Sequence, residues 1–283
     1  MPKARVIYQV QSIETEPRAG GKAEREIGRR LVAPFLVARA RADVVAMIDG
    51  LRTRLASREL LPVDAPDAGE VADAFDRVYA RRPLRDNAGG TMRNSSTWVF
   101  VVARLLQPSL IVESGTFMGH SSWLLAEAAP EARVVTFDVV REHGRLSDRR
   151  VDYRLGDWSD AKDMWDLPAD TLCLFDDHIS HRRRFEEAQA RGVRLALVDD
   201  DYPATALYAT GSPPVPTAAM LIDPALVAGT ECVWERPGKR FRYTMTAKDV
   251  MAGRRLAWTE PMPDLTPFNR YVPQAPMTLV GLG

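Results

Sequence analysis

Apolar residues recur along the chain in two alternating patterns, and their order predicts an α/β protein. Between residues 109 and 201, short apolar runs typical of buried parallel strands alternate with stretches in which apolar positions recur at helical spacing. The predicted strands cover residues 109–114, 132–140, 151–158, 171–178 and 193–201, and the predicted helices cover residues 121–129 and 181–192. This alternation implies right-handed crossovers, with helices on both faces of the sheet. We therefore predict a Rossmann-like, doubly wound and mostly parallel sheet.

Two further helical stretches precede these elements. Apolar positions in residues 24–57 and 68–82 have helical spacing, and a connection rich in Pro and Asp separates the two stretches. They predict an N-terminal helical extension over residues 1–86, followed by a ligand-binding domain over residues 87–283. We interpret the extension as a scaffold, or as the surface through which the chain would form a homo-oligomer, rather than as part of a catalytic site.

Loops and late β segments complete the pattern. Residues 83–96 form a polar loop with glycines, residues 202–216 form a proline-rich loop, and both are expected to roof a substrate pocket. Residues 230–245 and 277–283 resemble strands that could add an antiparallel edge to the sheet.

Composition narrows the class of partner. The 283 residues carry 38 Lys and Arg against 38 Asp and Glu, and this zero net charge argues against nucleic acid as a partner. No apolar run approaches the roughly 20 residues of a membrane span, and residues 1–12 lack the apolar core of a signal peptide. We therefore expect a cytoplasmic protein with no membrane partner. Cys173 and Cys232 suggest neither a disulfide framework nor a zinc site.

The stretch LIVESGTFMGHSSWLL, residues 110–125, carries the strongest chemical signal. Its apolar strand ends in Glu113, and Gly115 and Gly119 then permit backbone conformations and close approaches that a side chain would block. A segment with helical character follows, with Ser121 near its start. Strand, glycine turn and helix N-terminus together form the crevice in which α/β sheets bind small ligands.

Acidic residues at the next strand ends indicate a nucleoside ligand. Asp138 ends the second predicted strand, where it can accept hydrogen bonds from ribose hydroxyls. Asp157 follows the third strand, where adenine would lie, and Trp158 is available to stack on it. Taken alone, Asp138 could equally be a turn residue at a strand end. Three acidic strand ends in succession beside a glycine turn favour the nucleoside site.

The spacing of the glycines discriminates between nucleoside ligands. A dinucleotide site uses the pattern G-x-G-x-x-G, in which backbone amides and the helix dipole hold a pyrophosphate. Here the pattern is E-x-G-x-x-x-G-x-S, without a third glycine, and Glu113 would repel a phosphate while attracting a cation. S-adenosylmethionine carries a sulfonium and an ammonium group and has no phosphate. Electrostatics therefore favours it over NAD.

These motifs resemble those of a known family. Glu113, Gly115, Thr116, Gly119 and Ser121, with Asp138 downstream, resemble the cofactor motifs of class I S-adenosylmethionine-dependent methyltransferases. The commonest form of the motif has a second glycine where this chain has Phe117, and the variant is similar to the branch of catechol-type and macrolide-sugar O-methyltransferases and cephalosporin-hydroxylase-like proteins. The resemblance covers about residues 87–283. It implies an S-adenosylmethionine-binding enzyme that methylates a hydroxyl group.

A second group of carboxylates suggests a metal. Asp177 ends the fourth predicted strand and Asp199 and Asp200 end the fifth, so they can converge on one edge of a parallel sheet. Clustered carboxylates repel one another unless they are protonated or bridged by a cation, and oxygen ligands suit Mg²⁺. The alternative is that they cap neighbouring helices. The family resemblance matches Asp177 and His178 to an Asp-His pair, and Asp199 and Asp200 to an Asp-Asn pair with aspartate replacing asparagine.

Two points of this assignment stay open, together with two competing functions. Asp176 is a competing metal ligand, because the repeated aspartate leaves the register open by one residue. His178 or Asp177 could accept a proton from the hydroxyl of a sugar, polyol or natural product, whereas His181 is expected to be structural. The alternatives are a non-catalytic cofactor-binding or assembly protein with a methyltransferase fold, and a nicotinamide-dependent oxidoreductase.

Overall fold

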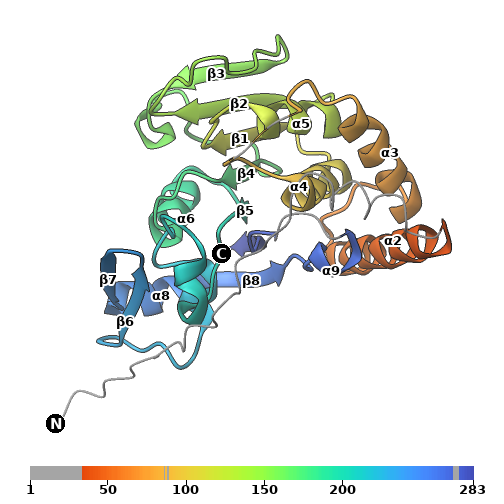
Figure 1. Ribbon diagram of the computed structural model, residues 1–283. Coiled ribbons are helices and arrows are strands. Elements are labelled where there is room, and N and C mark those ends of the chain that lie inside the picture. The colour runs from red at the N-terminus through yellow and green to blue at the C-terminus, as the bar shows by residue number, and fades with distance from the viewer. Residues whose placement is uncertain (1–33, 86, 88, 270–273) are drawn as a thin grey trace.

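The computed structural model describes residues 34–85, 87, 89–269 and 274–283. Its centre is a seven-stranded sheet with helices on both faces (Figure 1). The strands of this sheet are β1 (Leu110–Ser114), β2 (Arg133–Asp138), β3 (Val151–Leu155), β4 (Leu172–Phe175), β5 (Leu195–Val198), β8 (Leu256–Pro261) and β9 (Thr278–Leu282). The helices are α2 (Pro34–Ser57), α3 (Ala68–Ala80), α4 (Arg93–Leu106), α5 (His120–Ala128), α6 (His181–Gln189), α7 (Ala218–Ile222), α8 (Ala247–Arg255) and α9 (Thr266–Asn269).

The strand order is β3-β2-β1-β4-β5-β9-β8. Strands β1 to β5 pair in parallel, and β9 runs antiparallel to both β5 and β8. Strand β8 is therefore again parallel to β1–β5, so the reversed strand lies one position inside the edge of the sheet. The predicted doubly wound, mostly parallel α/β fold with an antiparallel contribution at one end is confirmed.

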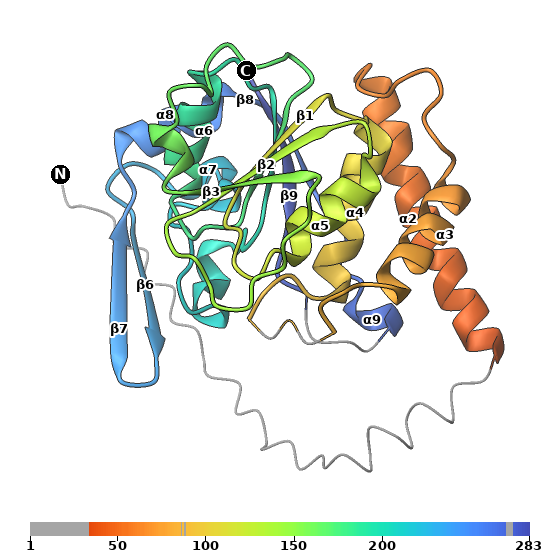
Figure 2. The same cartoon turned by 90° about the horizontal axis from the view of Figure 1, so that it is seen from above.

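Alternation along each central strand divides the core into two layers. Ile111 packs with α2–α5 on one face of the sheet, whereas Val112 packs with α6 and α7 on the other. All five residues of β1 are buried, as expected for a parallel strand with helices on both faces. Figure 2 shows the two helical layers on opposite sides of the sheet.

One late segment lies elsewhere than expected. Residues 277–283 include β9, but residues 230–245 form a separate hairpin of β6 (Glu231–Arg236) and β7 (Lys239–Thr244), which projects from the body of the molecule (Figure 2). The rings of Trp234 and Phe241 stack across this hairpin with centroids 5.4 Å apart. At this end of the main sheet the edge strand is β8, and the sequence pattern did not indicate this strand.

The N-terminal helices share the core of the sheet. Ile48, Leu51 and Leu55 of α2 are fully buried, and Arg54 of α2 lies 2.7 Å from Glu260 of β8. The predicted helix over residues 24–57 lies partly outside the described residues, which begin at residue 34. The division into an extension over residues 1–86 and a second domain, and the homo-oligomer that the extension would form, stay predictions.

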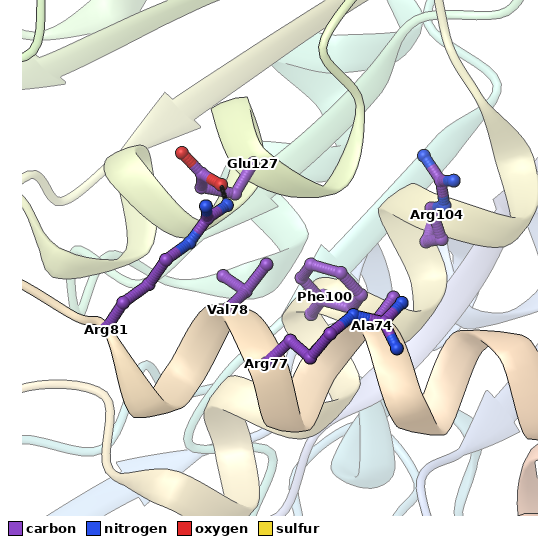
Figure 3. A pocket seen from close by; sticks show the side chains of 7 residues that line it. All are labelled: Ala74, Arg77, Val78, Arg81, Phe100, Arg104 and Glu127. Atoms are coloured by element: carbon purple, nitrogen blue, oxygen red, sulfur yellow. Dashed lines mark hydrogen bonds and ion pairs between the residues drawn. The ribbon is translucent and has the colours of Figure 1, made fainter.

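A shallow groove of about 340 Å³ lies between α3, α4 and α5 (Figure 3). Phe100 and Val78 line it, and Arg81 reaches from the end of α3 to Glu127 of α5. It is separate from the carboxyl ends of the strands, where an α/β sheet binds its ligand. Among the helices that the structure describes, none combines the length and the apolar character needed to cross a membrane.

His120 joins α5 to its neighbours as a neutral side chain. It is 3% exposed, its Nε2 atom lies 3.2 Å from Ser96 Oγ of α4, and its ring meets Tyr79 edge-on at 5.9 Å. Burial, together with the charge of Arg82, lowers the pKa of His120 to about 4. The folded protein therefore binds no proton at His120 in a range where the unfolded chain does.

This difference predicts a loss of stability in mild acid. As the pH falls from about 6.5 towards 4, His120 is protonated in the unfolded chain but not in the folded one, so the free energy of unfolding should fall, by about 2 kcal/mol at pH 5. Urea unfolding at about pH 7.5 and about pH 5 measures the loss, and His120→Gln should reduce it by that amount. Equal acid-induced losses in the wild type and in His120→Gln would contradict the assignment.

Candidate functional site

A cavity of about 720 Å³ opens at the carboxyl ends of β1, β2, β4 and β5. It lies where the strand order reverses, between β1 and β4, which is the usual ligand crevice of an open α/β sheet. Residues 89–92 and 210–212 also line it, so both loops that the sequence placed over a pocket reach this cavity. The predicted site residues that line it are Gly115, Asp138, Asp157, Asp177, His178, Asp199 and Asp200.

The glycine turn is set by a close backbone contact. Gly115 has φ +106°, and a Cβ atom there would lie 2.2 Å from the carbonyl oxygen of Asp176. The turn after β1 can therefore lie directly against the turn after β4 only if residue 115 has no side chain. Gly119 has φ +78° and precedes the first turn of α5, where a Cβ atom would lie 3.1 Å from the carbonyl oxygen of Leu146.

Glu113 lies beneath the cavity and does not line it. It is fully buried on the α5 side of the sheet, where its carboxyl group accepts hydrogen bonds from Ser122 Oγ and, at 2.6 Å, from Thr136 Oγ1. Burial raises the pKa of Glu113, which favours the neutral form. The expectation that Glu113 faces a cationic ligand therefore does not fit its position. Its alternation with Val112 turns it towards the helix instead.

Thr116 and Ser121 belong to the same buried network. Thr116 Oγ1 lies 2.6 Å from Thr136 Oγ1, and Ser121 is 4% exposed. Neither residue lines the cavity. Together with Gly119, they support the shape of the turn. The sequence predicted that they would contact the cofactor, but they do not line the cavity.

Asp138 joins the end of β2 to the glycine turn at the cavity. It lines the cavity at the end of β2, and its two carboxylate oxygens accept hydrogen bonds from the amides of Phe117 at 2.8 Å and Val140 at 2.9 Å. These bonds tie β2 to the glycine turn. The remaining lone pairs of the carboxylate are available to a ligand hydroxyl.

Trp158 lies in the core, away from the cavity. It is 0% exposed, its ring packs against Phe175 at 5.6 Å, and the guanidinium of Arg191 covers it at 4.6 Å. The predicted stacking on adenine does not fit this position, because both sides of the ring are occupied. The exposed apolar side chains that line the cavity near Asp138 are instead those of Phe117, Val139 and Val140, which are 37%, 70% and 53% exposed.

Arg184 is a site residue that the sequence reasoning missed. Its side chain is 2% exposed and lines the cavity from α6. Nη1 lies 2.9 Å from Asp157 Oδ1, Nη2 lies 3.2 Å from Asp157 Oδ2, and Nε lies 2.7 Å from Asp177 Oδ2. Burial by itself raises the pKa of a carboxyl group, yet the hydrogen bonds from Arg184 and the Ser159 amide lower the pKa of Asp157 to about 2.

This arginine changes the assignment of the carboxylates after β4. Asp177 Oδ2 accepts hydrogen bonds from Arg184 and, at 2.5 Å, from Ser114 Oγ, and Asp177 Oδ1 accepts one from the Ile179 amide at 3.0 Å. Asp177 is thus bound by donors of the protein itself and does not fit the predicted role of metal ligand or proton acceptor. Asp176, the competing residue, is instead a carboxyl group whose pKa is raised by burial and by the charges of Asp199 and Asp200.

Asp176, Asp199 and Asp200 form an acidic cluster at the end of the cavity near β5. Burial and the charge of Asp200 raise the pKa of Asp199 to about 7, and burial and the charges of Asp199 and Asp200 raise that of Asp176. Such shifts are typical of carboxylates that lack a compensating cation. Within the described part of the chain, no group of three or more His, Cys, Asp or Glu residues has the geometry of a formed metal site.

His178 is paired with the acidic cluster. Its Nδ1 atom lies 3.2 Å from Asp200 Oδ2, and this hydrogen bond raises the pKa of His178. Both residues have positive φ, +57° for His178 and +53° for Asp200, which is unusual for non-glycine residues and is often found at functional sites. His181, in contrast, is 1% exposed and accepts a hydrogen bond from the Ala218 amide at 2.9 Å, as expected of a structural residue.

Comparison with known proteins gives matches at the level of solved structures. No family model matches the chain, and no curated protein matches it. A methyltransferase from Geobacter sulfurreducens has 18% identity and a TM-score of 0.41, over 82% of this chain and 96% of that chain. The O-methyltransferase TomG from Streptomyces achromogenes, in complex with S-adenosylmethionine, has 16% identity and a TM-score of 0.39, over 83% and 97%. An O-methyltransferase from Bacillus cereus has 14% identity and a TM-score of 0.38, over 84% and 99%.

The proteins in these structures are methyltransferases, the class that the sequence motifs resemble.

The contact at Gly115 predicts a destabilising substitution. Gly115→Ala should lower the free energy of unfolding by about 2 kcal/mol or more, because the new methyl group strains a positive φ and also displaces the Asp176 backbone. Gly229→Ala is a matched control, since Gly229 has φ +91° but no atom within 4 Å of the place that a new methyl group would take. Urea unfolding of both variants measures the difference, and equal losses would show that the contact with Asp176 is unimportant.

Proposed function

We propose that the chain binds S-adenosylmethionine in this cavity and transfers its methyl group to a hydroxyl group of a small molecule. The observation that carries the proposal is the charge of the cavity. The acidic residues that line it are Asp138, Glu142, Asp157, Asp176, Asp177, Asp199 and Asp200. Among the described residues that line the cavity, Arg184 is the only arginine and there is no lysine. Such a lining disfavours a pyrophosphate and suits a nucleoside with cationic groups.

The chain's own groups fit the parts of this cofactor. Asp138 can accept hydrogen bonds from the ribose hydroxyls, and the exposed side chains of Phe117 and Val139 offer apolar contacts to a planar base. When bound, S-adenosylmethionine supplies a methyl group on a positively charged sulfur. A nicotinamide dinucleotide fits less well, because the acidic lining and the missing third glycine leave its phosphates without a partner.

The groups near β5 suit the activation of a hydroxyl. His178, held by Asp200, can accept the proton of an acceptor hydroxyl, and the carboxylate of Asp200 can stabilise the imidazolium that results. The loops contribute the hydroxyl groups of Thr91 and Ser212 to the cavity, and α4 contributes that of Ser95. This polar lining supports a sugar, polyol or hydroxylated natural product as the acceptor.

We further propose that the reaction requires Mg²⁺. Asp176, Asp199 and Asp200 would hold the ion, because their oxygens are hard ligands and their mutual repulsion would be relieved by a cation. Bound there, the ion would lower the pKa of a hydroxyl group of the acceptor. Asp177 is left out of this set because its carboxylate is bound by Arg184.

Titration calorimetry tests the identity of the cofactor. S-adenosylmethionine and S-adenosylhomocysteine should bind, and NAD should not. Asp138→Ala should weaken binding of either by roughly 1–3 kcal/mol, through lost ribose contacts and a loosened turn. Asp223→Ala is the control, since Asp223 also accepts a hydrogen bond from the amide two residues on, at 2.9 Å, but does not line the cavity. Binding of NAD in preference to both ligands would contradict the proposal.

Turnover assays test the metal and the reaction together. With a panel of polyols, sugars and phenols, excess chelator should abolish methyl transfer and Mg²⁺ should restore it. Asp176→Asn and Asp199→Asn should each lower turnover by about 100-fold while cofactor affinity changes little. Asp177→Asn should leave the Mg²⁺ concentration for half-maximal rate unchanged. Full activity in excess chelator would contradict the requirement for a metal. Cofactor binding without turnover on any acceptor would favour a non-catalytic binding protein.

A further inference from the structure

We propose that Arg184 is a positioning residue that holds the nucleoside half of the cavity in its binding shape, an inference that rests on the function proposed above. The arginine clamp consists of Arg184 and the two carboxylates that it bridges from different loops, Asp157 and Asp177, and Arg184 also binds Glu187 of its own helix at 2.6 Å. None of these contacts reaches the acidic cluster near β5. The arginine clamp therefore affects the position of the cofactor rather than the chemistry at the acceptor hydroxyl.

The topology of the sheet leaves a gap that the clamp closes. Asp157 follows β3 and Asp177 follows β4, and the order β3-β2-β1-β4 separates these strands by two others. Strand pairing therefore cannot fix the two loops relative to each other. The guanidinium binds both carboxylates at once, at 2.9 Å and 2.7 Å, and so sets the distance across the cavity. A rigid planar fork suits this task, because its donors have fixed directions.

The clamp also determines where the cavity is negative. Asp157 accepts hydrogen bonds from Arg184 and the Ser159 amide, and Asp177 accepts them from Arg184, Ser114 and Ile179. Both carboxylates are thus bound by donors of the protein itself. Asp138, which is bound by backbone amides, lies at one end of the cavity, and the acidic cluster lies at the other.

A role in stability alone explains this arrangement poorly. Buried ion pairs seldom stabilise a fold more than apolar side chains of similar size would. Phe185, the next residue of α6, is 1% exposed and packs in the core, whereas the buried side chain of Arg184 lines the cavity. What an apolar residue could not do is hold two loops at the cavity in one orientation.

The experiment compares neighbouring arginines of α6. Arg184→Met removes the clamp, Arg184→Lys keeps the charge but loses the fork, and Arg183→Met is the matched control. Arg183 also lies 3.3 Å from Asp157 and 2.6 Å from Glu187, but its side chain is 47% exposed. The affinity for S-adenosylhomocysteine is measured by calorimetry, and circular dichroism establishes that each variant is folded.

Arg184→Met should weaken binding of S-adenosylhomocysteine by about tenfold or more, which is about the contribution of one hydrogen bond to the affinity. Arg184→Lys should recover part of the loss, and Arg183→Met should stay within about twofold of the wild type. A purely structural role would lower the unfolding temperature of Arg184→Met and leave the affinity of the folded protein unchanged. If Arg184→Met does not fold, Arg184→Lys and Asp157→Asn are used instead, and both should bind more weakly than the wild type.

The outcomes separate this inference from the proposed function. A wild-type protein that does not bind S-adenosylhomocysteine contradicts the proposed function. A wild-type protein that binds it, with Arg184→Lys and Asp157→Asn binding equally well, overturns the arginine clamp alone.

Discussion

Repulsion among carboxylates is the constraint on which the organisation of this site depends. A parallel sheet brings the carboxyl ends of its strands to one edge, and this chain has aspartates at or just after β2, β4 and β5. Buried charges of one sign are costly unless each is bound by donors. The carboxylates along this edge of the sheet differ in how they are stabilised. Backbone amides bind Asp138, one buried arginine binds Asp157 and Asp177, and Asp176 and Asp199 lack a cation and have raised pKa values.

Backbone geometry maintains this distribution of charge. The contact between Gly115 and the Asp176 carbonyl brings the turns after β1 and β4 together, so the carboxylates on either side of the switch point face one cavity. On the far side, His178 and Asp200 both have positive φ and bind each other. Such conformations persist only where the surrounding structure holds them. The site is therefore specified by its backbone turns as much as by its side chains.

Much of the fold could be predicted from the sequence, because the central strands are short apolar runs and their order is simple. Strand β8 was not indicated, because it is only partly buried. Residues 230–245 were expected to be β structure, but the pattern did not show that they pair with each other rather than with the main sheet. The acidic neighbour of Trp158 suggested a place beside a ligand, but the local sequence does not reveal that Phe175 and Arg191 enclose its ring.

Two of the errors at the site had a detectable signal. His181, Arg184, Phe185 and Ala188 have the spacing of one helical face and are the buried residues of α6, so Arg184 could have been placed on the inner face. Likewise, alternation in β4 turns Cys173 and Phe175 towards α6. Asp177 continues that series and meets Arg184, whereas Asp176 continues the opposite one. The two neighbouring aspartates therefore have different surroundings, Asp177 beside Arg184 and Asp176 beside Asp199 and Asp200.

The two halves of the cavity depend on different kinds of structure, and this limits what any sequence motif could reveal about the acceptor. The half with Asp138 and Gly115 is built at strand ends, whose positions the sheet fixes. Residues 89–92 and 210–212 also line the cavity, and they belong to loops far apart in the chain. Loops can change without disturbing the sheet, so the same fold can accept different substrates. The identity of the acceptor is therefore a property of these loops, and glycine and aspartate motifs at the strand ends carry no information about it.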